Sequence, residues 1–145
     1  MKEIRLRRKS IRRFLVDTNL FISAIKKWAK STDLLLYLLT STEIELIVNE
    51  VLIGEYRKFT LKLGAPEFLE LVSSVVVVLN PSEEYVKDCK QYFPENKMAD
   101  VVHAATCLQY DAVLISNDKH FDKIKNMKLI EVWKINEAIE EFNIL

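Results

Sequence analysis

The stretch that decides the fold is Ile11-Arg12-Arg13-Phe14-Leu15-Val16-Asp17-Thr18-Asn19. Residues 11–16 end in three consecutive apolar side chains and predict a short strand, and the polar residues 17–19 predict a turn. From Leu20 to about Thr42 apolar residues recur at helical spacing, which predicts a helix. A strand followed by a polar turn and a helix is typical of an α/β fold, in which ligands bind beyond the carboxyl ends of the strands.

The rest of the chain continues to alternate between predicted strands and helices. The strands are predicted at residues 44–48, 75–79, 112–116 and 129–133. The helices are predicted at residues 50–64, 82–93, 98–110 and 135–142, with a further helix that begins at Pro66. Residues 121–127 are predicted to be a short helix or a turn. Residues 75–79 are four valines and a leucine, a composition that predicts a fully buried strand. The alternation predicts an α/β fold with a mostly parallel sheet.

The length and composition fit one globular domain. The chain has 145 residues, of which 50% are hydrophobic and 29% are charged, a balance that excludes a mainly disordered chain. Only two glycines, Gly54 and Gly64, are present, so glycine-rich phosphate loops and the nucleophile elbow are excluded. The two cysteines, Cys89 and Cys107, form no CxxC pair, so neither a disulfide framework nor a cysteine zinc site is expected.

Neither a membrane segment nor a secretion signal is expected from the sequence. The chain has no apolar run of about 18 residues, the length that a transmembrane helix needs. The apolar run at residues 14–16 is interrupted by Asp17 and is too short for the core of a signal peptide. We therefore expect a cytoplasmic protein without a membrane partner.

Charge is balanced over the whole chain but is concentrated at its start. The chain has 21 Lys and Arg and 21 Asp and Glu, and residues 1–13 hold seven basic groups and one acid, so this arm carries +6 and the remainder −6. Arginine binds phosphate through two parallel hydrogen bonds, so the basic arm predicts a polyanion partner. The alternative is a solvated tail. The candidate RNA-binding residues of the arm are Arg5, Arg7, Arg8, Lys9, Arg12 and Arg13.

Four acidic residues occupy corresponding places in the predicted fold. Asp17 follows the first strand, and Asp118 comes two residues after the fourth. Glu55 lies about two turns into the helix after the second strand, and Asp100 lies in the first turn of an alanine-rich helix. All four positions face the carboxyl edge of a parallel sheet, so we expect the carboxylates to converge there.

Such a group of carboxylates predicts a divalent metal site. Clustered carboxylates repel one another, and a bound cation relieves the repulsion. Oxygen ligands suit Mg²⁺ or Mn²⁺ better than Zn²⁺, and such an ion can polarise a phosphoryl group and activate a water. For Asp17 and Asp118 taken alone, helix capping is the alternative. We prefer Glu55 to Glu50, because the helix dipole already favours an acid at the helix start, where Glu50 lies.

Four segments of the sequence together resemble PIN domains. They are Phe14-Leu15-Val16-Asp17-Thr18-Asn19, Asn49-Glu50-Val51-Leu52-Ile53-Gly54-Glu55-Tyr56, Met98-Ala99-Asp100-Val101-Val102-His103-Ala104-Ala105 and Leu114-Ile115-Ser116-Asn117-Asp118-Lys119-His120-Phe121. Each segment carries one of the four acids. The usual Thr of the last motif is Ser116 here, which keeps the hydroxyl group. The resemblance runs from about Phe14 to Trp133, nearly the whole chain.

The resemblance implies a three-layer α/β/α sandwich and a metal-dependent endoribonuclease of the VapC-like toxin group. A PIN-like nuclease domain of residues 14–145 would then follow the basic arm of residues 1–13. An RNA substrate, an antitoxin protein and a second copy in a homodimer are the implied partners. Asp17, Asp100 and Asp118 would hold the metal, Glu55 would hold a second ion or orient the attacking water, and Thr18, Asn19 and Ser116 would be polar groups around them.

Other interpretations stay open at this point. A nucleic-acid-binding module of the same fold, with weak or no catalysis, fits the basic arm equally well. A dehalogenase-like phosphatase is disfavoured, because it needs a second Asp where this chain has Asn19. His103 shares a helix face with Asp100 and is either a ligand or proton carrier or a hydrogen-bonded structural histidine. Asp122 is a candidate for a further acid at the rim, and the leucine-rich segment 34–39 packs either on a second copy or in the domain's own core.

Overall fold

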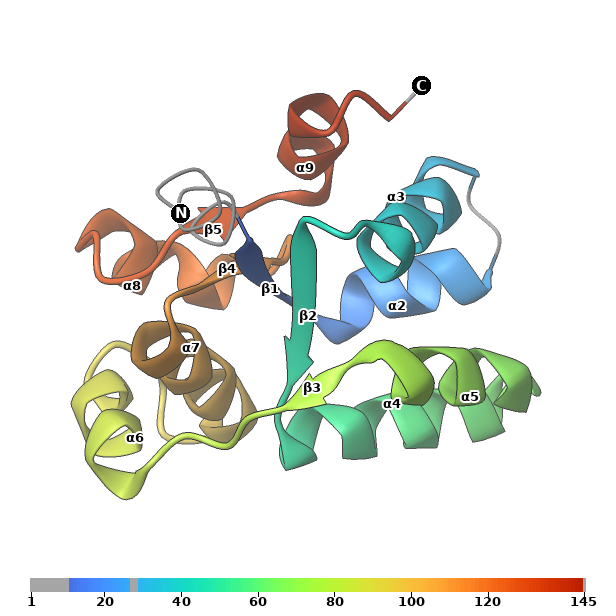
Figure 1. Ribbon diagram of the computed structural model, residues 1–145. Helices are drawn as coiled ribbons and strands as arrows, with labels where there is room; N and C mark the ends of the chain where they lie inside the picture. Colours follow the sequence, from blue (N-terminus) through green and yellow to red (C-terminus); the bar gives the residue numbers. More distant parts are fainter. Residues whose placement is uncertain (1–10, 27–28, 145) are drawn as a thin grey trace, which may run out of the picture.

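The computed structural model describes residues 11–26 and 29–144 and has a five-stranded sheet between layers of helices (Figure 1). The strands are β1 (Arg12–Val16), β2 (Ile44–Val48), β3 (Val77–Val78), β4 (Ala112–Ile115) and β5 (Val132–Trp133). The helices are α2 (Thr18–Ile25), α3 (Ala29–Thr40), α4 (Glu50–Lys62), α5 (Pro66–Val75), α6 (Glu83–Lys90), α7 (Met98–Tyr110), the 3₁₀ helix η1 (Lys119–Phe121), α8 (Asp122–Asn126) and α9 (Ile135–Glu141). Within the described ranges, no helix has the length and apolar character needed to cross a membrane.

Strand β1 lies at the centre of the sheet. The strand order is β3-β2-β1-β4-β5, and every neighbouring pair is parallel. Helices α2, α3 and α9 lie on one side of the sheet, and α6 and α7 lie on the other (Figure 1). The predicted three-layer α/β/α sandwich is therefore confirmed. Since β2 lies on one side of β1 and β4 on the other, the topological switch point, where α/β sheets bind ligands, lies between β1 and β4.

The two strands at the middle of the sheet bury their carboxyl-terminal halves. In β1, residues 14–16 are at most 1% exposed, and in β2, residues 46–48 are at most 4% exposed. Burial on both faces is typical of central parallel strands. As a result, the polar residues that directly follow β1 and β2 lie at the border of the core, where their side chains are held by neighbouring elements.

The single helix predicted over residues 20–42 is two helices in the structure. Helix α2 ends with Lys26, whose N–H donates to the Ile22 carbonyl at 3.0 Å. Helix α3 packs against α2, and Thr32 Oγ1 donates to the Ala24 carbonyl at 3.0 Å. One helix of this length would be about 33 Å long and would run past the sheet. Two shorter helices instead bury their apolar residues over the same face.

The strand predicted at residues 75–79 is shorter than expected and is not buried. Helix α5 continues through Val75, and β3 contains only Val77 and Val78, which are 38% and 50% exposed. Among residues 11–26 and 29–144, β3 is an edge strand that pairs with β2 alone, so less of this part of the protein surrounds its side chains. The prediction of a fully buried strand is therefore wrong, since apolar composition alone does not distinguish an edge strand from a central one.

The leucine-rich segment 34–39 belongs to the domain's own core. Leu34, Leu35, Leu38 and Leu39 are at most 7% exposed, whereas Leu36 is 43% exposed. These leucines lie in α3, which packs on α2 and contacts β2 and α9. Of the two interpretations of this segment, filling of the domain's own core is confirmed for the four buried leucines.

Candidate metal centre

Asp17 joins the carboxyl ends of β1 and β4. It is the N-cap residue of α2, and its Oδ1 accepts the Thr18 N–H at 2.8 Å. Its Oδ2 accepts the Ser116 hydroxyl at 2.6 Å, across the gap between the two strands. Burial raises the pKa of Asp17 above its usual value, although the hydrogen bond from Ser116 opposes this. Each oxygen accepts one hydrogen bond and keeps a lone pair for a cation.

Asp118 is placed by the turn that follows β4. The Ser116 hydroxyl oxygen accepts the Asp118 N–H at 3.0 Å, so one serine positions both Asp17 and Asp118. Asp118 Oδ1 accepts the His120 N–H at 2.9 Å and caps η1. Capping and ligand binding are therefore compatible for both aspartates, because the cap bond leaves other lone pairs free.

Glu55 reaches the carboxyl edge of the sheet from the second turn of α4. Its Oε2 accepts the Thr18 hydroxyl, and its Oε1 lies 3.1 Å from His103 Nε2. Burial alone would raise the pKa of Glu55, but the hydrogen bonds from His103 and Thr18 outweigh it, so the pKa lies below the usual value. The carboxylate is thus kept ionised and held at both oxygens. Glu50, the alternative, has an exposed side chain at the start of α4.

A buried hydrogen-bond chain behind Glu55 determines which nitrogen of His103 carries the proton. Asn49 Oδ1 caps α4 by accepting the Leu52 N–H at 2.8 Å, so the amide nitrogen of Asn49 faces His103 Nδ1 at 3.1 Å and Thr106 Oγ1 at 3.0 Å. Nδ1 is therefore an acceptor, and Nε2 carries the proton and donates to Glu55. His103, 1% exposed, thus holds Glu55 in place, which matches the interpretation as a hydrogen-bonded structural histidine.

Asp100 and Asp118 form a second group together with His120. His120 Nδ1 lies 3.2 Å from Asp100 Oδ2 and 2.8 Å from Asp118 Oδ1. Burial raises the pKa of Asp100, and the charges of Asp118 and Asp17 raise it further. The effect of Asp17 indicates that the two groups of side chains share one electrostatic environment at the switch point.

The donor atoms fit a divalent cation. Asp17 and Glu55 offer carboxylate oxygens that lie close together beside His103, whose Nε2 carries a proton and is not free for an ion. Asp100, Asp118 and His120 offer three atoms within 4.8 Å of one another. Among the described residues His120 Nδ1 is buried but forms no hydrogen bond, as expected of a nitrogen suited to a cation. The carboxylates could hold the ion. Burial, and after it the negative charges of Asp118 and Asp17, raise the pKa of Asp100, and a bound cation would offset these effects.

The other predicted site residues fall in different places. Thr18 and Ser116 contact the acids directly. Asn19 is exposed, and in the described part of the chain its side chain forms no hydrogen bond. Asp122 belongs to neither donor group, but with Asp118 it lines a hollow of about 250 Å³. The lining of the hollow also includes the lysines and asparagines Lys119, Lys125, Lys134, Asn117 and Asn136.

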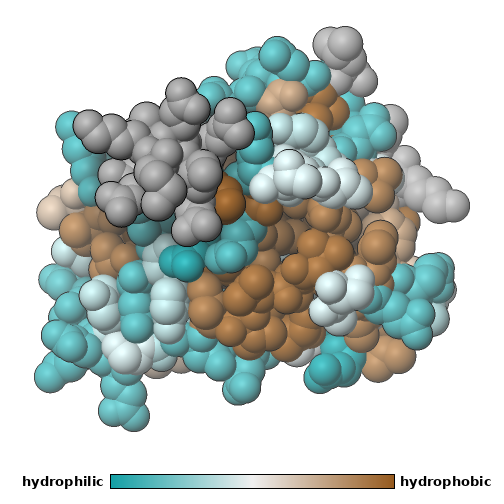
Figure 2. All heavy atoms as spheres, viewed as in Figure 1, coloured by the Kyte–Doolittle hydropathy of each residue, from teal (hydrophilic) through white to brown (hydrophobic). Residues whose placement is uncertain are grey.

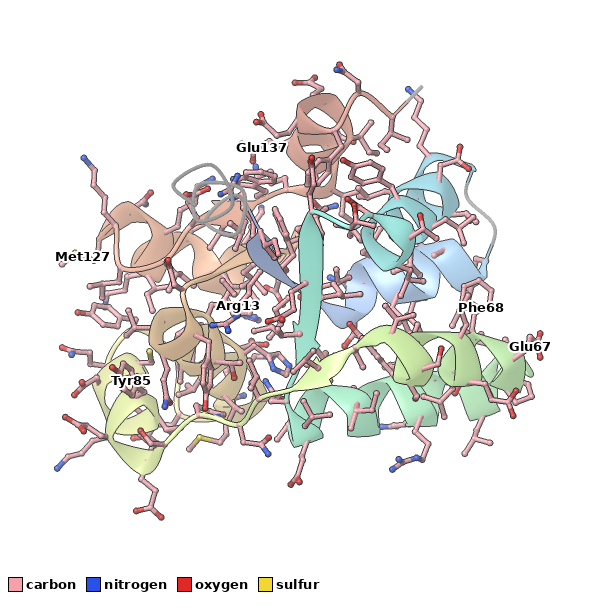
Figure 3. All side chains as sticks on the ribbon, in the orientation of Figure 1. Arg13, Glu67, Phe68, Tyr85, Met127 and Glu137 are labelled. Carbon is pink, nitrogen blue, oxygen red and sulfur yellow. The ribbon has the colours of Figure 1, made fainter. Side chains whose placement is uncertain are left out.

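The described residues of the basic arm lie at the opposite end of β1. Arg13 Nε donates to Glu45 at 2.7 Å, and its guanidinium also donates to the Tyr110 carbonyl at 3.1 Å, between β1 and α7 (Figure 3). Arg12 lies 3.5 Å from Glu131. At about 3.3 Å per strand residue, Arg13 lies about 13 Å from Asp17. The remaining candidates of the arm, Arg5, Arg7, Arg8 and Lys9, lie outside the described residues.

The contact of His120 with the acids was not predicted, and neither was that of His103 with Glu55. His103 was expected to share a face with Asp100, but the structure turns it toward Glu55, which is 48 positions away in the chain. For His120 the available signal was its position two residues after Asp118, inside the turn. A residue at that place in a capped turn lies close to the capping carboxylate.

Comparison with known proteins identifies similar sequences and folds. Residues 14–127 match the family model of the PIN domain. VapBC2 from Rickettsia felis, solved bound to a DNA fragment from its promoter, has a TM-score of 0.63 at 15% identity, over 84% of this chain and 98% of that chain. VapBC-1 from nontypeable Haemophilus influenzae has a TM-score of 0.62 at 23% identity, over 86% and 98%. PAE2754 from Pyrobaculum aerophilum has a TM-score of 0.61 at 16% identity, over 92% and 96%. No curated protein matches the chain.

Proposed function

The chain belongs to the PIN domain family, and on this premise we propose that it is an endoribonuclease that hydrolyses RNA phosphodiester bonds with Mg²⁺ or Mn²⁺. The observation that carries the proposal is the gathering of Asp17, Glu55, Asp100 and Asp118 in two neighbouring groups at the switch point between β1 and β4. Four carboxylates in these groups supply oxygen ligands, which suit such ions. The nuclease activity typical of PIN domains is the chemistry that this donor set supports best.

The four acids are proposed to have two roles: three hold the ion, and one orients the attacking water. When bound, a divalent ion polarises the phosphoryl group and lowers the pKa of a water molecule. Asp17, Asp100 and Asp118 are proposed to hold it. Glu55, ionised and fixed at both oxygens, is proposed to accept a hydrogen bond from the attacking water and to orient it.

Basic groups beside the acids support RNA as the substrate. Lys119 and Lys134 are exposed on the hollow next to Asp118, where they can contact backbone phosphates on either side of the scissile bond. The basic arm is proposed to add a further polyanion contact through Arg5, Arg7, Arg8 and Lys9. Arg12 and Arg13 are proposed to contribute less, because their side chains already contact Glu131 and Glu45.

The decisive experiment is cleavage of end-labelled single-stranded and structured RNA in the presence of Mg²⁺, Mn²⁺ or a chelator. We expect cleavage that depends on metal and is lost in Asp17→Asn and Asp100→Asn, because each change removes a charged ligand. Circular dichroism of both variants checks that they remain folded. Full activity of folded Asp17→Asn, or equal cleavage with chelator, would contradict the proposal.

The choice of acid on α4 has its own matched pair of variants. Glu55→Gln should lower kcat by about 10²-fold or more, because an orienting contact to the water is lost. Glu50→Gln lies on the same helix, is exposed and should leave kcat within a factor of two or so of the native value. If Glu50→Gln lowered kcat more than Glu55→Gln did, the residue that orients the water would be Glu50.

A nucleic-acid-binding module without catalysis is the second candidate, favoured by the lysines around the hollow. It predicts binding of RNA that weakens with salt, with no cleavage in any metal. Deletion of residues 2–9 then tests the arm without removing Arg12 and Arg13 from β1. Lost binding with surviving cleavage at high enzyme concentration would assign the arm to substrate capture.

The partners of this chain are also proposals. We propose that it acts as the toxin of a toxin–antitoxin pair, because its structural neighbours include VapBC assemblies. A cytoplasmic location and a homodimer are part of the same proposal. An apolar area on one face, over β3 and the adjoining helices, suits a protein partner (Figure 2). It includes the exposed Val75, Val77 and Val78. Sedimentation at micromolar concentration tests the dimer, and a clean monomer there would contradict it.

A further inference from the structure

The ring of His120 lies beside two carboxylates without hydrogen bonding to either. Its Nδ1 is 2.8 Å from Asp118 Oδ1 and 3.2 Å from Asp100 Oδ2. Both distances are short enough for a hydrogen bond, yet Nδ1 forms none with the described residues, so the angles are unsuitable. A buried nitrogen that lies this close to two carboxylate oxygens and forms no hydrogen bond with either suits a cation shared by all three atoms.

The separations are those of neighbouring ligands on one small ion. A six-coordinate ion with ligand distances of about 2.1 Å places adjacent ligand atoms about 3.0 Å apart. The two separations of His120 Nδ1 lie on either side of that value. We propose that His120 Nδ1 is a metal ligand beside Asp100 and Asp118, and that this mixed nitrogen–oxygen site binds Mn²⁺ in preference to Mg²⁺. The inference rests on the proposed metal-dependent function and adds the identity of one ligand.

The turn after β4 holds His120 in this position. The His120 N–H donates to Asp118 Oδ1 at 2.9 Å, which fixes the backbone. The next residue, Phe121, is fully buried and packs edge-on against Phe93 with the ring centroids 5.6 Å apart. Because the residues on both sides are anchored, the imidazole is held close to the acids before an ion arrives, which reduces the cost of binding.

A nitrogen ligand changes which ion the site prefers. Mg²⁺ prefers oxygen ligands, whereas imidazole suits first-row transition ions. His103 provides the contrast within the same chain. Its Nδ1 accepts from Asn49 and its Nε2 donates to Glu55, so His103 has no free lone pair for an ion although it lies next to two carboxylates.

The test is the pulsed electron paramagnetic resonance spectrum of Mn²⁺ bound to the full chain without a histidine tag. The chain contains only two histidines, so single variants assign any imidazole coupling. We expect coupling from a coordinated imidazole nitrogen in the native chain and in His103→Gln, and its loss in His120→Asn, which places an oxygen near the position of Nδ1. In competition titrations the preference for Mn²⁺ over Mg²⁺ should fall about tenfold in His120→Asn.

The outcomes separate this inference from the proposed function. Bound Mn²⁺ without imidazole coupling in the native chain, or an unchanged metal preference in His120→Asn, would overturn the role of His120 while metal-dependent RNA cleavage still supported the nuclease. The expected coupling and preference with intact RNA would support His120 as a ligand and reject the nuclease. A folded native chain that binds no Mn²⁺ would overturn both.

Discussion

At the scale of single residues, the position of Glu55 depends on side chains that touch no substrate. The side-chain oxygen of Asn49 caps α4 by accepting the Leu52 N–H, so its side-chain nitrogen faces and orients His103. His103 in turn donates to Glu55. Thr18 holds the other oxygen of the same carboxylate. The cap of α4 and the contact of His103 with Glu55 are therefore parts of one hydrogen-bond chain, so a change in one should alter the geometry of the other.

Replacing His103 should test this chain directly. His103→Leu removes the donor to Glu55 and leaves the Asn49 amide without its acceptor, so we expect kcat to fall about 10–100-fold and unfolding free energy to fall by about 1–3 kcal/mol. His103→Gln keeps an N–H donor and should recover part of kcat. Steady-state kinetics and urea denaturation measure the two effects. If Gln and Leu reduce kcat equally, the hydrogen bond to Glu55 is not what matters.

The metal-free protein should lose stability as pH rises through the titration of Asp100. The pKa of Asp100 is raised by folding, so the folded state binds more protons than the unfolded state between the ordinary value of 3.8 and the raised value. Stability contributed by Asp100 therefore falls as pH increases across that window, and Asp17 adds to the effect. Glu55 has a lowered pKa and acts in the opposite direction, with its contribution lost as pH falls below 4.5.

Asp100→Asn isolates the contribution of this one group. The variant should be more stable than the native chain at neutral pH without metal, and its advantage should shrink toward acidic pH. Added Mn²⁺ at about 100 times its dissociation constant should stabilise the native chain by about 2.7 kcal/mol. Asp122→Asn, at an exposed acid of α8 that belongs to neither donor group, is the matched control: it should match the native chain in stability without metal and in its stabilisation by Mn²⁺. Thermal unfolding across pH supplies the comparison.

At the scale of elements, the turn after β4 and the edge strand β3 behave differently. The turn is tied to Asp17 by the Ser116 hydroxyl and anchored by the buried Phe121. Strand β3 contributes two residues, and within the described part of the chain one of its sides is unpaired. The sheet is thus well supported where the acids gather and weakly supported at the β3 edge, which is where a partner strand or helix could add contacts.

One variant in the edge strand β3 and one in its neighbour β2 should differ in how much they lower the free energy of unfolding. Val78→Lys is at a half-exposed edge position and should change the unfolding free energy by no more than about 0.5 kcal/mol. Ile47→Ala, at a fully buried position of β2, should cost about 2–5 kcal/mol. Urea denaturation measures both. A large loss in Val78→Lys would mean that β3 is buried in solution, as a dimer through this edge would require.

At the scale of the whole molecule, opposite charges lie on opposite ends of β1. The four acids gather at the carboxyl edge, and Arg12 and Arg13 lie at the amino edge, where they contact Glu131 and Glu45. Lysines around the hollow beside Asp118 place positive charge next to the acids at the carboxyl edge. Such an arrangement can hold a polyanion across a metal site without a basic group among the metal ligands.

The salt dependence of RNA binding should show whether the lysines around the hollow contact RNA phosphates. Each phosphate contact to single-stranded RNA contributes about 0.7 to the slope of log affinity against log salt. The double variant Lys119→Ala, Lys134→Ala should therefore reduce the slope by about 1.4 and raise KM more than it lowers kcat. Lys62→Ala, on α4, is the control. An unchanged slope in the double variant would place the RNA elsewhere on the surface.

The sequence by itself determined the order of strands and helices, the parallel sheet and the position of Asp17 and Asp118 just after their strands. These features depend on local periodicity and on the rule that parallel strands end at one edge, and both can be read from nearby residues. Helix capping by the two aspartates, the alternative considered for each of them alone, rests on the same local grounds, and the structure has both caps.

Only the tertiary structure decided the exposure of β3, the division of the first helix and the roles of the two histidines. Each depends on how residues distant in the chain pack together. In the described residues β3 has β2 as its one neighbouring strand, and α3 packs against α2. His103 contacts Glu55, which is 48 positions away in the chain. His120 is close to Asp118 in sequence, but its contact with Asp100 requires α7 and the turn after β4 to lie side by side. Packing of distant elements therefore selects which side chains complete the site, because local sequence does not carry that information.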